Sequence, residues 1–281
     1  MTEFEVPVLS IKHLNKQFGP GCNHCMNSEP DSLIKNYCSV CGTVFACRDV
    51  SFEVYPGEVL GIVGESGSGK STLMQCLYFD QEATSGEAYI STYQNGLKNL
   101  FQESSQQQRY IRNNLMGKVY QNPLLGLKID FSSIGNIAEK LIAAGSRNVE
   151  MMEARGAELL EKVNIPVQRR KEAPKNFSGG MQQRVQIAKA LSNYPPILLL
   201  DEVTTGLDLS VQASVLDLIK NLQHELNISI VLVSHDLGVI RMLADRTMVM
   251  LDGQVIEQGL TDQILEDPQH AFTQQLVHSL L

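Results

Sequence analysis

The stretch that decides the fold is GESGSGKST, which runs from Gly64 to Thr72. It satisfies the pattern G-x-x-x-x-G-K-[ST] in full. The apolar run Val59–Val63 comes before it, as expected of a buried parallel strand, and the residues from Ser71 onward can start a helix. In this strand–loop–helix context, the glycines let exposed backbone amides wrap around the phosphates of a nucleotide.

Two side chains of the loop carry most of the predicted chemistry. We expect Lys70 to neutralise the β- and γ-phosphates and Ser71 to bind Mg²⁺. The other predicted nucleotide contacts of the loop are Gly64, Ser66, Gly67, Ser68, Gly69 and Thr72. The alternative is a glycine-rich turn that matches the pattern by chance, and further motifs argue against it.

A second motif is an apolar run, Ile197–Leu200, that ends in Asp201 and Glu202. We expect Asp201 at the carboxyl end of a strand beside the phosphate loop, where it would hold Mg²⁺ through water. Glu202 could orient or deprotonate the attacking water. A strand that merely ends in two solvated acids is the alternative, which the phosphate loop makes the weaker interpretation.

A third motif, FSGGMQQR, runs from Phe177 to Arg184. Ser178 is predicted to cap a helix, and with Gly179 and Gly180 it would place free amides and the positive end of a helix dipole at the helix start. An ordinary capped helix is the alternative. The candidate apolar positions of that helix are Val185, Ile187, Ala188 and Leu191.

The composition of the 281 residues, 43% hydrophobic and 19% charged, is that of an ordinary globular chain. The net charge of −8 and the pI of about 5.3 argue against a broad basic surface, so no nucleic-acid partner is expected. No run of 18 apolar residues is present, and Met1–Glu5 lacks the basic residues of a signal peptide. We therefore expect a cytoplasmic chain whose six cysteines are not disulfides by default.

Four of the cysteines interrupt the place where a short hairpin should join the strands expected at 8–18 and 43–54. Cys22 and Cys25 form one Cys-x-x-Cys pair, and Cys38 and Cys41 form another after a spacer of twelve residues. Two such pairs are typical of a metal site, and we expect a closed, structural zinc site with four thiolates. A rubredoxin-like iron site, a redox dithiol pair and four unligated cysteines are the alternatives.

The remaining candidates near this loop have simpler interpretations. Cys47 and Cys76 are expected to be small apolar residues on a strand and a helix. His24 is expected to be solvated rather than a ligand.

The order and spacing of the three nucleotide motifs resemble those of the ATP-binding-cassette (ABC) ATPases. The resemblance covers nearly the whole chain, and it implies an α/β P-loop NTPase in which residues 1–281 form a single ABC ATPase domain. The implied parts are a parallel core sheet, an antiparallel β subdomain over roughly residues 6–62 and 85–92, and a helical subdomain over 122–180. The zinc-ribbon-like loop over 19–46 would be an insertion.

The resemblance also assigns residues outside the three motifs. Gln121 matches the Q-loop glutamine that meets Mg²⁺ and the nucleophilic water, and His235 matches the switch histidine that contacts the γ-phosphate. Asp208 matches the D-loop, and Phe18 stands where an aromatic residue packs against adenine. The alternatives are a histidine capping a strand end at His235 and a core aromatic residue at Phe18.

This resemblance implies a Mg²⁺-dependent ATPase with Glu202, His235, Gln121 and Lys70 as its catalytic residues. In the family two copies stack head to tail. ATP would therefore lie between Lys70 of one protomer and Ser178 and Gly180 of the other, in a homodimer. Val203 occupies a position that is usually proline, which should alter the loop without removing a catalytic group.

Several segments, many of them outside the catalytic positions, resemble one branch more closely, the ATP-binding proteins of the phosphonate carbon–phosphorus lyase system. These segments are 47–52, 55–58, 135–137, 164–166, 177–187 and 205–212. The resemblance implies an ATPase of phosphonate catabolism whose ATP-driven dimerisation remodels the lyase core complex.

Two other functions stay open at this point. The tail from Gly259 to Thr273 resembles the oligopeptide and nickel importers, which implies membrane permease subunits as partners and a peripheral place at the inner membrane. The importer's cargo would be a peptide, nickel or a phosphonate. A cassette protein of nucleic-acid repair is disfavoured by the low basicity, the single cassette and the lack of a long coiled coil.

Overall fold

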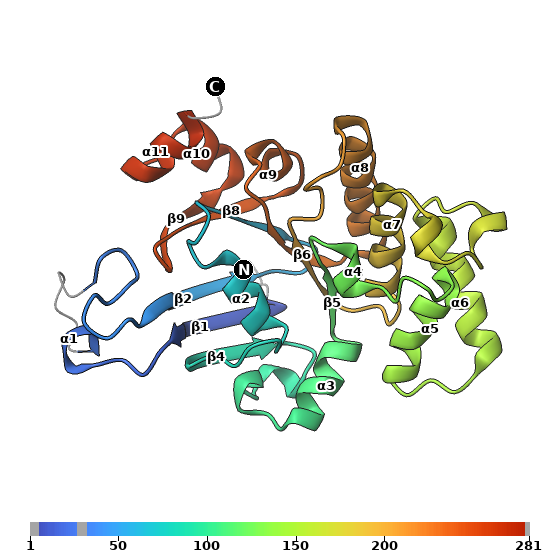
Figure 1. Ribbon diagram of the computed structural model, residues 1–281, viewed down its shortest axis with the longest axis horizontal. Helices are drawn as coiled ribbons and strands as arrows, with labels where there is room; N and C mark the ends of the chain where they lie inside the picture. The colour runs from blue at the N-terminus through green and yellow to red at the C-terminus, as the bar shows by residue number, and fades with distance from the viewer. Residues whose placement is uncertain (1–5, 27–32, 279–281) are drawn as a thin grey trace, which may run out of the picture.

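The computed structural model describes residues 6–26 and 33–278, so the N-terminal residues 1–5 and residues 27–32 of the expected insertion lie outside the described residues. Its centre is a six-stranded sheet with the order β5-β6-β7-β3-β8-β9 (Figure 1). The strands are β3 (Val59–Val63), β5 (Met116–Val119), β6 (Ile197–Asp201), β7 (Ser229–Val233), β8 (Arg246–Leu251) and β9 (Gln254–Leu260). All neighbours pair in parallel except β8 and β9.

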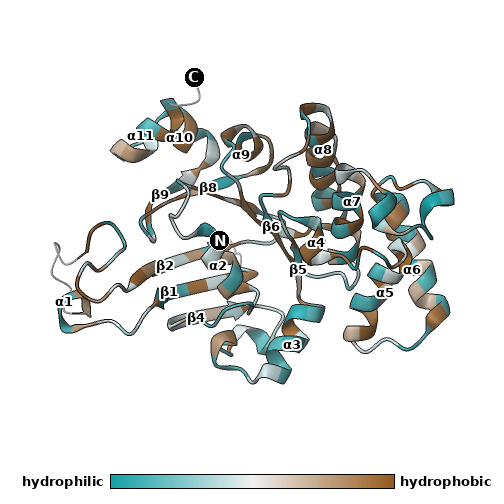
Figure 2. Cartoon of the chain, in the orientation of Figure 1, coloured by the Kyte–Doolittle hydropathy of each residue, from teal (hydrophilic) through white to brown (hydrophobic). Residues whose placement is uncertain are grey.

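The central strands are buried on both faces of the sheet, which explains their uninterrupted apolar sequences. Alternate residues enter opposite cores, because successive side chains of a strand point to opposite faces. In β6, Leu198 and Leu200 pack in the core under the helical layer, whereas Ile197 and Leu199 pack in the core under the antiparallel sheet. Figure 2 shows these strands in hydrophobic colours and much of the outer helical surface in hydrophilic ones.

A separate antiparallel sheet has the order β2-β1-β4. Its strands are β1 (Leu9–Phe18), β2 (Val44–Val54) and β4 (Ser85–Ile90). The prediction that this layer extends to residue 62 was wrong, since β3 lies in the central sheet between β7 and β8. The turn at Pro56 and Gly57, where Gly57 has φ +69°, separates β3 from β2 and lets the chain change sheets.

The antiparallel edge of the central sheet was not predicted. Strands β8 and β9 form a hairpin through Asp252 and Gly253, whose φ values are 48° and 81°. Two adjacent residues with positive φ are typical of the tight turn that joins antiparallel strands. An Asp-Gly pair between two apolar runs could have revealed it.

Helices cover the central sheet and project from one end of the molecule (Figure 1). The helices are α1 (Asn23–Met26), α2 (Lys70–Leu77), α3 (Ser105–Asn114), α4 (Pro123–Gly126), α5 (Ser133–Ala143), α6 (Val149–Lys162), α7 (Gly179–Ala190), α8 (Leu209–Leu226), α9 (Leu237–Leu243), α10 (Thr261–Glu266) and α11 (Ala271–His278). Short 3-10 turns occupy 94–96, 100–102, 167–169 and 174–176. In the described part of the chain, no helix combines the length and apolarity that crossing a membrane requires.

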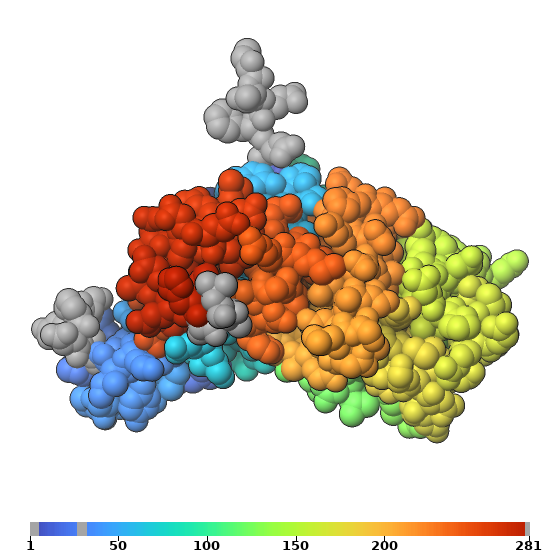
Figure 3. All heavy atoms as spheres, turned by 90° about the horizontal axis from the view of Figure 1, so that it is seen from above, coloured from blue at the N-terminus to red at the C-terminus, as the bar shows by residue number. Residues whose placement is uncertain are grey.

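The insertion lies between β1 and β2, which pair directly with each other in spite of it. The strand β2 starts at Val44, so residues 44–46 belong to the sheet and the described insertion is 19–26 and 33–43. Figure 3 shows this region (blue) at one end of the molecule, opposite the end formed by α5 and α6 (yellow-green).

Candidate nucleotide site and four-cysteine centre

The phosphate loop is held by the lysine at its end. Lys70 is buried, and its Nζ donates hydrogen bonds to the carbonyl oxygens of Gly64 at 2.8 Å and Glu65 at 2.7 Å and to Ser68 Oγ at 3.2 Å. Burial lowers the pKa of Lys70, while Glu202 and Asp201 act to raise it. The loop therefore closes around the Lys70 ammonium group, whose positive charge would attract a phosphate.

Two glycines of the loop are required by close backbone contacts. A Cβ at Gly64, where φ is +149°, would lie 2.1 Å from the Met250 carbonyl oxygen. A Cβ at Gly69, where φ is +104°, would lie 2.0 Å from the Ala46 carbonyl oxygen. Gly67 differs, because its Cβ would enter open space. The loop is thus pressed against β2 and β8 on one side and open on the other.

The open side faces a hollow of about 460 Å³. Nine of the predicted residues line it, namely Phe18, Ser66, Gly67, Gly69, Lys70, Ser71, Thr72, Glu202 and His235. Phe18 is 42% exposed, which excludes the alternative of a core aromatic residue at that position. Three further lining residues, Asn36, Val44 and Ala46, were not predicted.

The Glu202 carboxylate joins side chains from separate segments. Its Oε2 accepts hydrogen bonds from Gln121 Nε2 at 3.0 Å and Thr205 Oγ1 at 3.4 Å, and it lies 3.4 Å from His235 Nδ1. Glu202 has φ +48°, and its amide donates to the Val233 carbonyl at 2.9 Å. The following residue, Val203, is buried in the core.

Asp201 ends β6 beside this cluster, paired with Val233 of β7. Burial raises the pKa of Asp201 and Glu202 adds to this effect, whereas Lys118 and Lys70 lower it. Two carboxylates next to each other at the end of a buried strand favour a bound cation. Carboxylate oxygens are ligands that Mg²⁺ prefers, so Asp201 could hold Mg²⁺ here.

Two buried glutamines of α7 hold the residue that precedes Gln121. Gln186 Oε1 accepts from the Tyr120 amide at 2.6 Å, and Gln186 Nε2 donates to the Tyr120 carbonyl at 3.1 Å. Gln183 Nε2 contacts the same carbonyl at 3.4 Å, and its Oε1 accepts from Gln186 at 3.0 Å. Helix α7 therefore positions the segment that carries Gln121, a role that the spacing of Gln183 and Gln186 on one helix face could have suggested.

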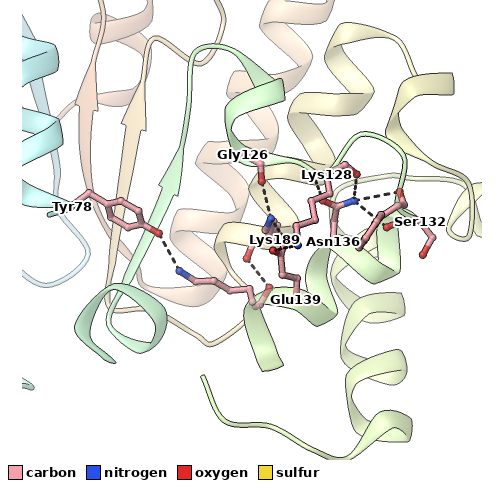
Figure 4. Close-up of polar contacts among 10 residues, drawn as sticks. Tyr78, Gly126, Lys128, Ser132, Asn136, Glu139 and Lys189 are labelled. Carbon is pink, nitrogen blue, oxygen red and sulfur yellow. Dashed lines mark hydrogen bonds and ion pairs between the residues drawn. The ribbon is translucent and has the colours of Figure 1, made fainter. Parts of the chain in front are cut away.

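The segment between Gln121 and α5 is fastened by a second polar network (Figure 4). Asn136 is buried, accepts from the Lys128 amide at 2.8 Å, and donates to the carbonyls of Lys128 at 3.0 Å and Ser132 at 3.1 Å. Lys189 of α7 donates to the Gly126 carbonyl at 2.8 Å and to Glu139 at 2.9 Å. These contacts tie the start of the helical region to α7.

The predicted residues of the third motif and Asp208 do not line the hollow. Ser178 caps α7 by accepting from the Met181 amide at 3.4 Å, and Asp208 caps α8 by accepting from the Val211 amide at 3.0 Å. Ser178 and Gly179 are exposed, while Gly180 is buried against Val211. The backbone bond from Val211 lowers the pKa of Asp208. The prediction that Ser178 caps a helix is confirmed, and none of these four residues lines the hollow.

The four cysteines of the insertion converge. The Sγ atoms of Cys22, Cys25, Cys38 and Cys41 all lie within 4.8 Å of one another. Individual Sγ–Sγ distances are 3.7 Å for Cys22–Cys25, 3.8 Å for Cys22–Cys38 and 3.7 Å for Cys25–Cys41. These separations are too long for disulfides, in which the sulfurs are roughly 2.0 Å apart.

The distances fit a tetrahedral metal. A zinc–sulfur bond of about 2.3 Å places two ligands of a tetrahedron about 3.8 Å apart. The Thr43 hydroxyl and amide lower the pKa of Cys41 to about 6, while burial raises the pKa of Cys25 to about 12. His24 is exposed and outside the cluster, and Cys47 and Cys76 are buried in the core, as predicted.

Residues 47–205 match the sequence profile of the family described as ABC transporter, and the chain therefore belongs to this family. Its fold is that of the ABC ATPases. It aligns with the dimeric post-hydrolysis state of the ATP-binding cassette MJ0796 bound to ADP and Pi, with a TM-score of 0.73 and 28% identity, over 90% of this chain and 98% of that one. The chain is accordingly an ATPase that binds ATP with Mg²⁺.

Two curated relatives and a second solved structure are also similar to this chain. The putative phosphonates utilization ATP-binding protein PhnK of Escherichia coli (strain K12) is 49% identical over 98% of both chains. The oligopeptide transport ATP-binding protein OppD of Bacillus subtilis (strain 168) is 38% identical over 85% of this chain and 67% of its own. The structure of cbiO1 from Clostridium perfringens, part of the ABC transporter complex cbiONQ, aligns with a TM-score of 0.74 and 25% identity, over 94% of this chain and 92% of that one.

Proposed function

We propose that the hollow beside the phosphate loop binds Mg²⁺–ATP and that Glu202 is the general base. Gln121 and His235 reach the same carboxylate oxygen, so they can orient an attacking water and sense the γ-phosphate. Lys70 neutralises the phosphates, and Ser71, Gln121 and Asp201 supply oxygen ligands to Mg²⁺ directly or through water. Phe18 packs against the adenine ring of the nucleotide.

We further propose that residues 1–281 act as one ABC ATPase domain that works as a homodimer. Ser178, Gly179, Gly180 and Asp208 lie outside the hollow of their own chain, which is what a composite site between two protomers requires. Each γ-phosphate would complete an interface that hydrolysis then opens. Residues 122–180 form the helical subdomain, and the Gln186–Tyr120 contacts just outside its two ends would carry its motion to Gln121.

The four-cysteine loop is proposed to bind Zn²⁺ as a structural ion. A site with four thiolates leaves no open coordination position, so the ion would stabilise the loop rather than react. Its part in folding follows from the small amount of apolar side chain that the loop buries: Ile34 is 67% exposed and Val40 is 67% exposed.

The physiological role that fits best is phosphonate catabolism in the cytoplasm, where ATP-driven dimerisation would remodel the carbon–phosphorus lyase core complex. The observation that carries this proposal is the 49% identity to PhnK over 98% of both chains. A second candidate is the motor of an ABC importer for peptides, nickel or phosphonate, bound to membrane permeases. The 38% identity to OppD favours that alternative.

The test is an affinity capture of the Glu202→Gln variant with ATP and Mg²⁺, from cytosol and from detergent-solubilised membranes, with the partners identified by mass spectrometry. The variant should hydrolyse ATP at least roughly a hundredfold more slowly and accumulate as an ATP-bound dimer. The wild-type protein with ADP serves as the control for partners that bind regardless of nucleotide.

Recovery of carbon–phosphorus lyase subunits with the ATP-bound variant supports the phosphonate role. Recovery of permease subunits instead would establish the importer alternative and reduce the likeness to PhnK to common ancestry. Normal ATP turnover in the Glu202→Gln variant would remove Glu202 from the role of base.

A further inference from the structure

The described second half of the four-cysteine loop, residues 33–38, forms part of the wall of the nucleotide hollow. Asn36 lines the hollow together with Phe18 of β1 and Val44 of β2. The insertion therefore reaches the site at the end occupied by Phe18. The phosphate loop and Glu202 occupy the other part of the lining.

Backbone contacts connect this segment to the two strands. The Phe45 amide donates to the Asn36 carbonyl at 2.7 Å, and Tyr37 forms an isolated antiparallel bridge with Val44. On its other side, Val44 pairs with Phe18 in the β1–β2 ladder. Strands β1 and β2 and the segment 33–38 thus form a continuous surface along one side of the hollow.

The Asn36 side chain is suited to contact a base. It is half-buried, and its amide forms no hydrogen bond with residues 6–26 and 33–278. A carboxamide offers an acceptor and a donor side by side, and so does the hydrogen-bonding edge of a nucleotide base. A base that stacks on Phe18 would therefore meet a polar group on the adjacent wall.

The position of this segment depends on Cys38. Residues 33–37 bury no hydrophobic side chain, and Tyr37 is 45% exposed. Cys38 is fully buried, with its amide donating to the Thr43 carbonyl at 2.9 Å and its sulfur within the four-cysteine cluster. A metal on the cysteines would fix Cys38, and Asn36 lies two residues away.

We propose that Asn36 contacts the nucleotide base and that the metal held by the four cysteines sets nucleotide affinity by keeping Asn36 in place. The inference rests on the proposed nucleotide and metal sites and adds a binding residue and a mode of regulation to them. Conditions that strip the metal would weaken nucleotide binding without altering the phosphate loop.

The test compares the binding of ADP and inorganic pyrophosphate, which has no base, by displacement of a fluorescent nucleotide. Asn36→Ala should weaken ADP binding roughly three- to tenfold, the effect of one lost hydrogen bond, and leave pyrophosphate binding unchanged. Ser39→Ala is the matched control, because Ser39 lies in the same loop but is exposed and does not line the hollow. Metal content, measured by elemental analysis, should be unchanged in both variants.

A second arm removes the metal with a chelator. Wild-type protein should lose ADP affinity by the same factor as Asn36→Ala, and the chelated Asn36→Ala variant should lose little more. Unchanged ADP binding in Asn36→Ala, or an equal loss for ADP and pyrophosphate, would overturn the base contact. Equal losses on chelation in wild type and Asn36→Ala would overturn the link to the metal.

Lys70→Ala separates this inference from the proposed function. It should weaken the binding of both ADP and pyrophosphate, since Lys70 faces the phosphates in either case. If Lys70→Ala changes neither, the assignment of the hollow to nucleotide fails. If Lys70→Ala weakens both and Asn36→Ala weakens neither, the assignment stands and the Asn36 inference alone fails.

Discussion

Replacement of Gln186 by methionine should uncouple the Q-loop from helix α7 and slow hydrolysis without weakening nucleotide binding. Gln186 is 1% exposed, and its side chain makes three hydrogen bonds, two with the Tyr120 backbone and one with Gln183. Methionine keeps the length of the side chain but makes none of them. At about 1 kcal/mol net for each bond, the free energy of unfolding should fall by about 3 kcal/mol.

The effect on catalysis follows from the next residue. The Tyr120 amide and carbonyl would lose their hydrogen bonds to Gln186. As a result, Gln121 would no longer be held 3.0 Å from Glu202. Since misplacement of a catalytic contact by about 1 Å can cost roughly a hundredfold in rate, we expect the turnover number to fall at least roughly tenfold. ADP affinity should stay within about twofold, a margin of roughly 0.4 kcal/mol, because Gln186 does not line the hollow.

The matched control is Gln223→Met in α8. Gln223 is also buried and bonds a backbone carbonyl, that of Gly57, but it touches neither the Q-loop nor the hollow. Unfolding is followed by chemical denaturation, and turnover by phosphate release at saturating ATP. If Gln186→Met slows turnover no more than Gln223→Met does, the Gln186–Tyr120 contact has no positioning role.

Three other outcomes are expected. Cys38→Ser should lower the bound metal from about one ion per chain and speed hydrogen exchange in residues 33–43, and unchanged metal by elemental analysis would exclude the four-cysteine site. Burial lowers the pKa of Lys140 to about 7, so the unfolded state binds more protons between pH 7 and about 10. Wild-type stability should therefore rise by about 2 kcal/mol from pH 7 to pH 9 relative to Lys140→Met, and a constant difference in denaturation would contradict this. Gly69→Ala should destabilise the nucleotide-free protein by roughly 2 kcal/mol more than Gly67→Ala, because both have positive φ but only Gly69 faces the Ala46 carbonyl; equal denaturation midpoints would refute the close contact.

The sequence did not locate every strand in its sheet. The run from Val59 to Val63 is apolar throughout, which indicates a strand buried on both faces but does not say which sheet it joins. Residues 44–46 were placed both in the strand predicted at 43–54 and in the insertion predicted at 19–46, and the structure places them in β2. Strand β9 is half-exposed and pairs only at the edge, so its pattern is weak compared with its Asp-Gly turn.

The sequence by itself determined the chemistry that is written in contiguous residues. The loop from Gly64 to Thr72 needs glycines for positive φ and close backbone contact, and these requirements are local. The acids after Leu200, the cap at Ser178 and the two Cys-x-x-Cys pairs are local in the same sense. Each was predictable because a short spacing specifies which atoms can meet.

Only the tertiary structure decided which of these segments meet one another. Gln121, Glu202 and His235 converge because their strands β5, β6 and β7 are neighbours in the central sheet, an order that the packing of both faces selects. The same holds for Gln186 against Tyr120 and for Asn36 beside Phe18. Contacts between residues far apart in the chain depend on how whole layers pack, and no local pattern encodes that.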